Sequence, residues 1–124
     1  MDSAALLTHL AELIDAHDWE GLPALLHPDF VCRYVHTGEV FDRDQWVRVN
    51  ADYPGFQGFH VEELVSDGDR AVLRARVTGT GSGGEEQVFA VATFATVRDG
   101  LLAELTEVWT DVDQQAPDGT RPLI

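Results

Sequence analysis

Four segments rich in Val, Phe, Thr and Leu fill the second half of the chain, and they constrain its fold more than any other feature. The segments span residues 59–66, 70–80, 86–98 and 101–112. Asp67-Gly68-Asp69 and Asp99-Gly100 are short hairpin turns between two pairs of them, while the glycine-rich stretch 79–84 is a flexible loop between the middle pair. Consecutive segments joined in this way form hairpins. The sequence therefore predicts a meander of four antiparallel strands.

The N-terminal residues have the periodicity of helices instead. A helix is predicted over residues 3–17 because its apolar residues fall on one side, at Leu6, Leu7, Leu10, Leu13 and Ile14. Asp18 is placed to cap a second, shorter helix over residues 19–26, which His27-Pro28 ends. We therefore expect two helices, joined by a tight bend, before the first strand.

A strand, a turn and a third helix occupy residues 30–55. Alternation in the strand places four side chains on one face, those of Phe30, Cys32, Tyr34 and His36. The helix begins at Asp42 or Asp44 and ends at Pro54-Gly55, with one face formed by Trp46, Val49, Asn50 and Tyr53. This order of elements predicts an α+β fold in which three helices pack on one face of a curved antiparallel sheet.

Composition limits the partners of the protein. Lys and Arg number 8 against 22 Asp and Glu, and a net charge of -14 repels phosphate backbones and anionic lipid. We therefore expect no nucleic-acid and no membrane partner.

The chain has no apolar run of about 18 residues, and its N-terminus lacks the basic residues of a signal peptide. Cys32 is the only cysteine, so no internal disulfide forms, and a cytoplasmic location is expected. The 124 residues are expected to form a single domain, with 113–124 as a polar tail.

The strand at residues 86–98 predicts a partner of another kind. Its two faces are both mostly apolar, with Phe89, Val91, Thr93, Ala95 and Val97 on one and Val88, Ala90, Ala92, Phe94 and Thr96 on the other. A strand that is apolar on both faces is covered on both faces. Because helices can cover only one of them, we expect a homodimer that packs through the outer face of the sheet.

Several short motifs, together with the order of elements, resemble a known family. The motifs are His17-Asp18-Trp19, His27-Pro28-Asp29-Phe30, Arg98-Asp99-Gly100 and Val108-Trp109-Thr110-Asp111. Over residues 3–113 the chain resembles the SnoaL-like branch of the nuclear transport factor two-like superfamily, which includes polyketide cyclases and shares its fold with ketosteroid isomerase and limonene epoxide hydrolase. The resemblance implies a cystatin-like α+β barrel, a cone-shaped sheet whose concave face is closed by three helices around a ligand pocket. Because this superfamily also includes proteins that only bind, the resemblance leaves the function open.

The last strand supplies the candidate acids and bases. Its alternation places Glu107, Trp109 and Asp111 on one face, unless a bulge changes the parity. Inside an apolar cone, burial would raise the pKa of either carboxyl toward that of a general acid or base. The resemblance implies that Asp111 is the acid/base, and the alternative is that Asp111 ends the strand and pairs with Arg33, Arg76 or a backbone N–H. His36 is the second candidate, as a proton relay or as a group that orients a carboxylate.

Polar aromatic and amide side chains are the candidate ligand contacts. Tyr34, Asn50 and Tyr53 can donate hydrogen bonds to a carbonyl or enolate oxygen. Flat apolar walls would come from Trp46, Phe59 and Trp109, although simple packing is the better interpretation for Trp46 and Phe59. Trp19 stands at the bend between the first two helices, where it either closes the corner or faces the pocket. The expected ligand is a small, largely apolar molecule.

Neither a metal nor a cofactor is expected. The five His residues have no HxxxH or HxH spacing, and the glycine-rich stretch joins two strands rather than a strand and a helix. Three functions remain open on the sequence alone. They are a cofactor-free acid/base enzyme of the cyclase, isomerase or hydratase type, a non-catalytic binding or accessory protein with the same pocket, and a structural dimerisation module with a filled cone.

Overall fold

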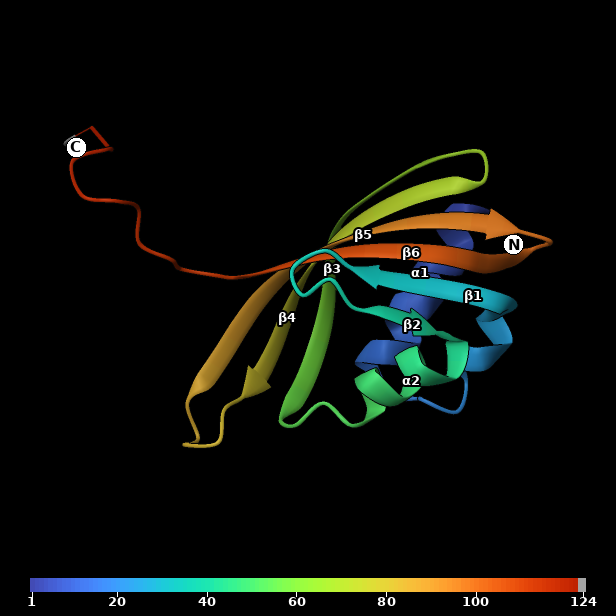
Figure 1. Ribbon diagram of the computed structural model, residues 1–124, viewed down its shortest axis with the longest axis horizontal. Coiled ribbons are helices and arrows are strands. Elements are labelled where there is room, and N and C mark those ends of the chain that lie inside the picture. The colour runs from blue at the N-terminus through green and yellow to red at the C-terminus, as the bar shows by residue number, and fades with distance from the viewer. Residues whose placement is uncertain (123–124) are drawn as a thin grey trace.

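Strand pairing confirms the meander of the second half of the chain. In the computed structural model, which describes residues 1–122, each of the last four strands pairs antiparallel with the next. These strands are β3 (Phe56–Asp67), β4 (Arg70–Thr80), β5 (Glu86–Arg98) and β6 (Leu101–Asp111). They form most of a six-stranded sheet with the order β2-β1-β6-β5-β4-β3. The sheet is strongly curved, and both α-helices lie within the curve, as the α+β prediction requires (Figure 1).

One edge of the sheet departs from the antiparallel prediction. β1 (Leu26–Tyr34) runs parallel to β6, while the short β2 (Val40–Asp42) runs antiparallel to β1. The sheet is therefore mixed. The pairing of β1 with β6 joins residues that are more than 70 positions apart in the chain, such as Cys32 and Leu105. Residue alternation within each segment carries no information about the direction of so distant a neighbour.

The helices also differ in part from the prediction. α1 (Ser3–Asp15) is capped by Asp2, and α2 (Arg43–Ala51) is capped by Asp42, which forms a capping box with Gln45. The second expected helix, over residues 19–26, is only a four-residue 3-10 helix, η1 (Leu22–Leu25). Pro23 stands near its start and lacks a backbone N–H, and the chain is already extended at Leu26. The structure thus has two α-helices and one short 3-10 turn in place of three helices.

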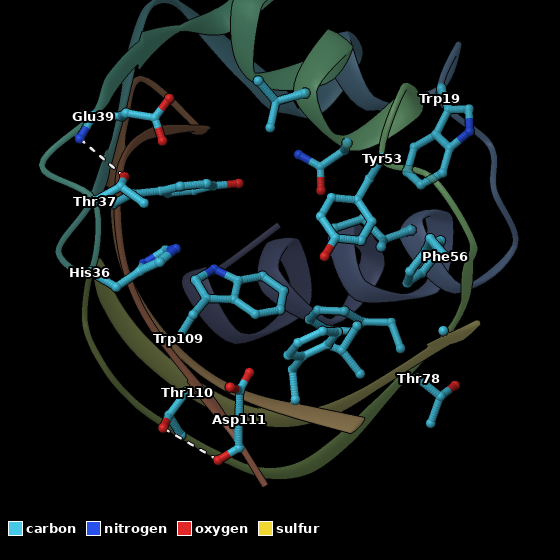
Figure 2. Close-up of a pocket in the computed structure, with 18 residues that line it drawn as sticks. Trp19, His36, Thr37, Glu39, Tyr53, Phe56, Thr78, Trp109, Thr110 and Asp111 are labelled. Atoms are coloured by element: carbon cyan, nitrogen blue, oxygen red, sulfur yellow. Dashed lines mark hydrogen bonds between the residues drawn. The ribbon is translucent and has the colours of Figure 1, made fainter. Parts of the chain in front are cut away.

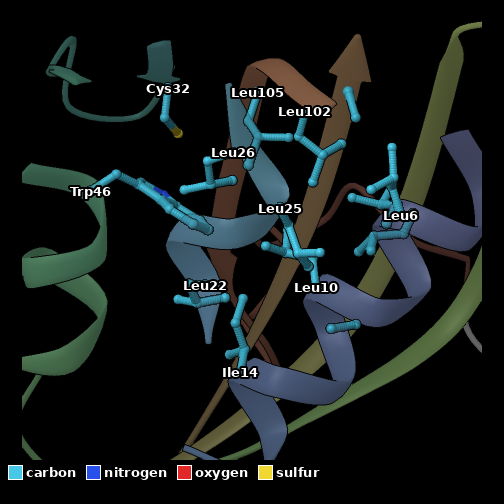
Figure 3. Close-up of a cluster of buried hydrophobic side chains, with 14 of the residues drawn as sticks. Leu6, Leu10, Ile14, Leu22, Leu25, Leu26, Cys32, Trp46, Leu102 and Leu105 are labelled. Carbon is cyan, nitrogen blue, oxygen red and sulfur yellow. The ribbon is translucent and has the colours of Figure 1, made fainter. Parts of the chain in front are cut away.

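The core lies between α1 and the sheet. Leu6, Leu10 and Ile14 of α1 face a leucine cluster formed by Leu22, Leu25, Leu26, Leu102 and Leu105 (Figure 3). Across the same core, Trp46 extends from α2 and is 1% exposed. On β4 the side chains of one face are buried, at Ala71, Leu73, Ala75 and Val77. This core fixes the position of α1, and α2 packs against β1, β2 and η1.

The remaining parts of the chain bear on several predictions. The pairing of β3 with β4 shifts in register between Val61 and Glu63, so β3 is irregular beside His60 and Glu62. Residues 113–122 extend away from the body of the molecule (Figure 1). The end of the predicted tail, Leu123-Ile124, lies outside the described residues. Within residues 1–122, no helix has the length and apolar character needed to cross a membrane.

Gly55, between α2 and β3, allows a test of this arrangement. It has a φ of +76°, and a Cβ added there would overlap the Thr80 carbonyl oxygen at the end of β4. Gly68, with a φ of +61°, has nothing within 4 Å of an added Cβ. We predict that Gly68→Ala costs about 1 kcal/mol of unfolding free energy from backbone strain alone, whereas Gly55→Ala costs about 3 kcal/mol or more. Urea denaturation of the two variants measures the difference, and equal costs would contradict the close approach of Gly55 to β4.

Candidate functional site

A cavity of about 420 Å³ opens between α2, the end of β1 and the sheet. Most of the wall is apolar or aromatic, and the polar groups come from the end of β1, the following turn, α2 and the end of β6 (Figure 2). Its lining residues are Ile14, Trp19, Tyr34, His36, Thr37, Glu39, Val49, Asn50, Tyr53, Phe56, Phe59, Val77, Thr78, Gly79, Phe89, Trp109, Thr110 and Asp111. Concave sites of this size and character are the usual sites of small-molecule binding.

Asp111, the last residue of β6, faces this cavity. Its carboxylate points into the space beside Trp109 (Figure 2). Within residues 1–122 this carboxylate has no hydrogen-bond or ion-pair partner. Arg33 pairs instead with Glu104 at 3.7 Å, and Arg76 lies 3.8 Å from Glu62. The pairing of Asp111 with either arginine, which the sequence left open, is therefore absent from this structure, and the carboxylate is available to a ligand.

Glu107, two residues earlier on the same face of β6, lies behind the cavity wall. The residue is 4% exposed and does not line the cavity. Its carboxylate accepts hydrogen bonds from Trp109 Nε1 at 2.8 Å, from Trp46 Nε1 at 3.2 Å and from the Cys32 thiol at 3.5 Å. Burial raises the pKa of Glu107, and the three donors oppose that rise in part. Glu107 is therefore not part of the cavity lining, and its predicted role of assisting an acid/base residue stays a prediction.

Tyr34, the last residue of β1, and His36, in the turn that follows it, lie together and line the cavity. Their rings are stacked with centroids 5.1 Å apart, and the His36 ring lies 6.4 Å from the Trp109 ring. Burial raises the pKa of Tyr34, the nearby Glu107 raises it further, and the Trp46 N–H lowers it in part. The Tyr34 hydroxyl therefore keeps its proton at neutral pH and can donate it in a hydrogen bond to a ligand oxygen.

The other predicted contacts divide between the cavity and the core. Asn50, Tyr53, Phe59 and Trp19 line the cavity, whereas Trp46 is buried in the core and does not. Asn50 Nδ2 donates to the Trp46 carbonyl at 2.8 Å, which fixes the amide. Trp19 packs against Phe56, with ring centroids 5.9 Å apart, and thus closes the corner and faces the cavity at once.

Glu39, Phe56 and Phe89 are lining residues that the sequence did not indicate. Glu39 follows the turn after β1, where Gly38 has a φ of +77° and Thr37 accepts a hydrogen bond from the Glu39 N–H at 3.2 Å. Alternation grouped Phe89 with Val91 and Ala95 on one face of β5, but it did not show that this face points inward or that Phe89 lines the cavity beyond the core. No distance between segments can be read from alternation, which is why these three residues were missed.

The charges that line the cavity are negative. Asp111 and Glu39 are its acidic residues, and no Lys or Arg belongs to the lining. Across residues 1–122, no group of three or more His, Cys, Asp or Glu side chains could hold a metal ion. The site thus combines aromatic rings, two exposed carboxylates and the hydrogen-bonding groups of Tyr34, His36 and Asn50. This arrangement can hold a small molecule and exchange protons with it.

Comparison with known proteins agrees with this geometry. Residues 7–105 match the model of the SnoaL-like domain. A candidate ketosteroid isomerase from Kribbella flavida is 25% identical, with a TM-score of 0.81 over 98% of this chain and 89% of that one. IdmH, a candidate polyketide cyclase from Streptomyces antibioticus, is 24% identical, with a TM-score of 0.76 over 88% of this chain and 92% of that one.

A more distant structure has the same fold. An epoxide hydrolase from M. tuberculosis that is similar to limonene epoxide hydrolase is 12% identical, with a TM-score of 0.73 over 87% of this chain and 82% of that one. No curated protein sequence matches the chain. The solved structures thus support the fold that the sequence predicted, a cone of the nuclear transport factor two-like type.

The buried carboxyl of Glu107 predicts a pH dependence of stability. Because its pKa is raised above the ordinary value of 4.5, folding favours the protonated form. This contribution to stability is complete below about pH 4.5 and is lost as the pH rises through the raised pKa, with a slope of at most about 1.4 kcal/mol per pH unit. Glu107→Gln removes the titrating group. We predict that the Tm of wild type falls relative to that of Glu107→Gln as the pH rises from about 4 to about 8, because Gln resembles the protonated carboxyl at every pH.

Glu104 offers a matched control on the same strand. Its side chain is 51% exposed and pairs with Arg33, so Glu104→Gln should show little of this dependence. Thermal denaturation of the three proteins across the pH range measures the effect. A difference between wild type and Glu107→Gln that stays constant with pH would contradict the raised pKa.

Proposed function

This chain belongs to the family of SnoaL-like domains, and from that premise we propose that it binds a small, largely apolar molecule and performs acid/base chemistry on it without a cofactor. The observation that carries the proposal is the Asp111 carboxylate, which faces an aromatic cavity and has no partner within residues 1–122. A carboxylate held in this way is free to take a proton from a bound molecule.

The chemistry that suits this site is proton transfer next to a carbonyl group. Asp111 would remove a proton from the carbon beside the carbonyl, and the electron pair of the broken C–H bond would move onto the carbonyl oxygen as an enolate forms. The protonated Tyr34 hydroxyl, with His36 beside it, would donate a hydrogen bond to that oxygen as its charge develops. In a β,γ-unsaturated ketone, return of the proton from Asp111 to the γ carbon completes an isomerisation. In a diketone, the enolate carbon attacks the second carbonyl carbon, and the alkoxide that forms takes the proton back from Asp111 to complete a cyclisation.

The similar structures support this class of reaction. Two of them are named for ketosteroid isomerase and polyketide cyclase, whose names describe rearrangement and ring closure. In our proposal Glu107 contributes indirectly, because its hydrogen bond to Trp109 Nε1 holds that ring in the cavity wall. The open cavity of about 420 Å³ argues against the filled cone of a purely structural module.

A non-catalytic binding protein is the second candidate, and one observation favours it. Asp111 and Glu39 are exposed to solvent at the cavity, so water reaches the carboxylate that would act as the base. Enzymes that form enolates commonly exclude water from the reacting centre. A carrier or accessory protein has no such requirement, and the aromatic wall alone would provide its affinity.

Asp111→Asn distinguishes the two candidates. We predict that cyclic ketones, sterol-like compounds or aromatic polyketides raise the Tm of both wild type and variant, since a ligand at 100 times its Kd adds about 2.7 kcal/mol to stability. Wild type should also exchange deuterium from heavy water into the carbon beside the ligand carbonyl, and Asp111→Asn should do so at least about 100-fold more slowly. Mass spectrometry of the recovered ligand measures the exchange.

Asp113→Asn is the matched control, because Asp113 is exposed and does not line the cavity. It should keep the exchange rate of wild type. Binding without exchange in wild type would overturn the enzymatic proposal in favour of the binding protein. Exchange at equal rates in wild type and Asp111→Asn would remove Asp111 from the role of base.

We also propose that the protein forms a homodimer through the outer face of the sheet. Phe94 of β5 and Val108 of β6 are 42% and 41% exposed on that face. Phe94 pairs across the strands with Val72, which in turn pairs with Val65, so the apolar side chains form a row over three strands. A patch of this kind favours burial against a second copy of the same surface.

Phe94→Asp tests the dimer. We predict that wild type sediments as a dimer at about 10 μM and that Phe94→Asp shifts it to a monomer, because a buried unpaired charge costs several kcal/mol. Val40→Asp is the control, since Val40 is 60% exposed on the edge strand β2, away from the outer-face row. Analytical ultracentrifugation measures both variants, and a monomeric wild type would refute the proposal.

A further inference from the structure

The cavity presents negative charge to whatever it binds. Asp111 and Glu39 supply the charged side chains of its lining, with no Lys or Arg among the lining residues that the structure describes. The whole chain adds a net charge of -14. A neutral apolar ligand gains nothing from this field and an anion is repelled by it, whereas a cation is attracted.

The aromatic rings of the wall provide the second part of the argument. Figure 2 shows Trp109 and Tyr53 extending into the cavity from opposite sides, Trp109 from β6 and Tyr53 from the segment just after α2. Ring faces attract a cation that lies within about 6 Å of the ring centre, and tryptophan does so most strongly. Trp109 Nε1 donates to Glu107 at 2.8 Å, which fixes the indole in the cavity wall. The ring is therefore already positioned before a cation binds.

We propose that the molecule bound in this cavity carries a cationic nitrogen, a protonated or quaternary amine, on an apolar body. The apolar body packs against the aromatic and aliphatic wall, and the cationic group lies over the rings near Asp111 and Glu39. The inference rests on the proposed function in that it concerns the same cavity, and it adds the charge of the ligand.

A hydrated metal ion suits this cavity less well than an organic cation does. The described residues hold no cluster of three His, Cys, Asp or Glu side chains that could coordinate one. Rings cannot replace the water shell of a small hard ion, whereas an alkylated ammonium group is weakly hydrated and large enough to touch several rings. Among cations, the wall therefore selects an organic one.

Two pairs of isosteric compounds test the charge directly. Phenyltrimethylammonium has nearly the shape of tert-butylbenzene, and choline has nearly that of 3,3-dimethyl-1-butanol, so each pair differs in charge alone. We predict that the cation of each pair binds at least about tenfold more tightly than its neutral isostere at physiological ionic strength. Chemical-shift titration of the indole N–H signals in wild-type protein measures the four dissociation constants.

Charge-removing variants locate the effect. Asp111→Asn and Glu39→Gln should each weaken binding of the cations by about threefold to tenfold and leave the neutral compounds unchanged. Asp67→Asn removes the same charge at the far end of β3, about 25 Å along the strand from Phe59 and beyond the screening length of about 8 Å. It should therefore leave all four constants unchanged.

Ring-removing variants provide an independent readout. Tyr53 is 50% exposed, so its replacement does not threaten the core. Tyr53→Leu should weaken binding of the cations more than that of their isosteres, while Tyr53→Phe keeps the ring and should retain the preference for the cation.

Two results would overturn the inference. If the neutral isosteres bind as tightly as the cations, the inference that the ligand is cationic is wrong. The proposal of an apolar ligand with Asp111 as base is tested separately, by the ketone panel. If none of the four compounds binds at millimolar concentration, the rings and carboxylates do not form a cation site, and this result leaves the deuterium exchange test unaffected.

Discussion

The hydrogen bonds to the Glu107 carboxylate are the interaction on which the rest of the structure depends. This buried group joins three elements, because it accepts from Trp109 of β6, from Trp46 of α2 and from Cys32 of β1. A buried carboxyl without such partners would cost several kcal/mol, so the donors are a condition for the fold to tolerate it. They also fix the indole of Trp109 as the wall between core and cavity. The hydrogen bonds of Glu107 therefore determine the position of the Trp109 ring, which separates the hydrophobic core from the cavity.

Two acidic residues on one strand face have different environments for this reason. Glu107 and Asp111 are four residues apart on β6, with side chains on the same side of the sheet. Glu107 lies under the aromatic wall, where each oxygen is hydrogen-bonded, and Asp111 lies past the wall, where its carboxylate meets solvent and the cavity. Burial decides which carboxyl supports the structure and which can meet a ligand. The residue type alone would have given both the same role.

Alternation in the sequence predicted the residues that share each face but not the depth at which each one lies. It grouped Cys32, Tyr34 and His36 on β1, and the structure spreads them from the fully buried core to the cavity rim. Depth depends on the parallel pairing of β1 with β6 and on the register shift in β1, which are interactions between distant segments. The shortened helix at η1 has a local cause instead, because Pro23 lacks the backbone N–H that the interior of a helix over residues 19–26 would need. The order of elements and the bends at glycine were predictable because short-range sterics determine them.

The most direct test of this account is the titration of Glu107 by NMR of its side-chain carboxyl carbon, with the indole N–H signals of Trp46 and Trp109 followed in the same samples. Because burial raises the pKa of Glu107 and both indoles donate to it, the carboxyl should titrate above 4.5, and both indole signals should shift with the same midpoint. A carboxyl that titrates as an ordinary glutamate, with indole signals that do not follow it, would contradict the buried hydrogen-bonded glutamate from which the cavity wall is built.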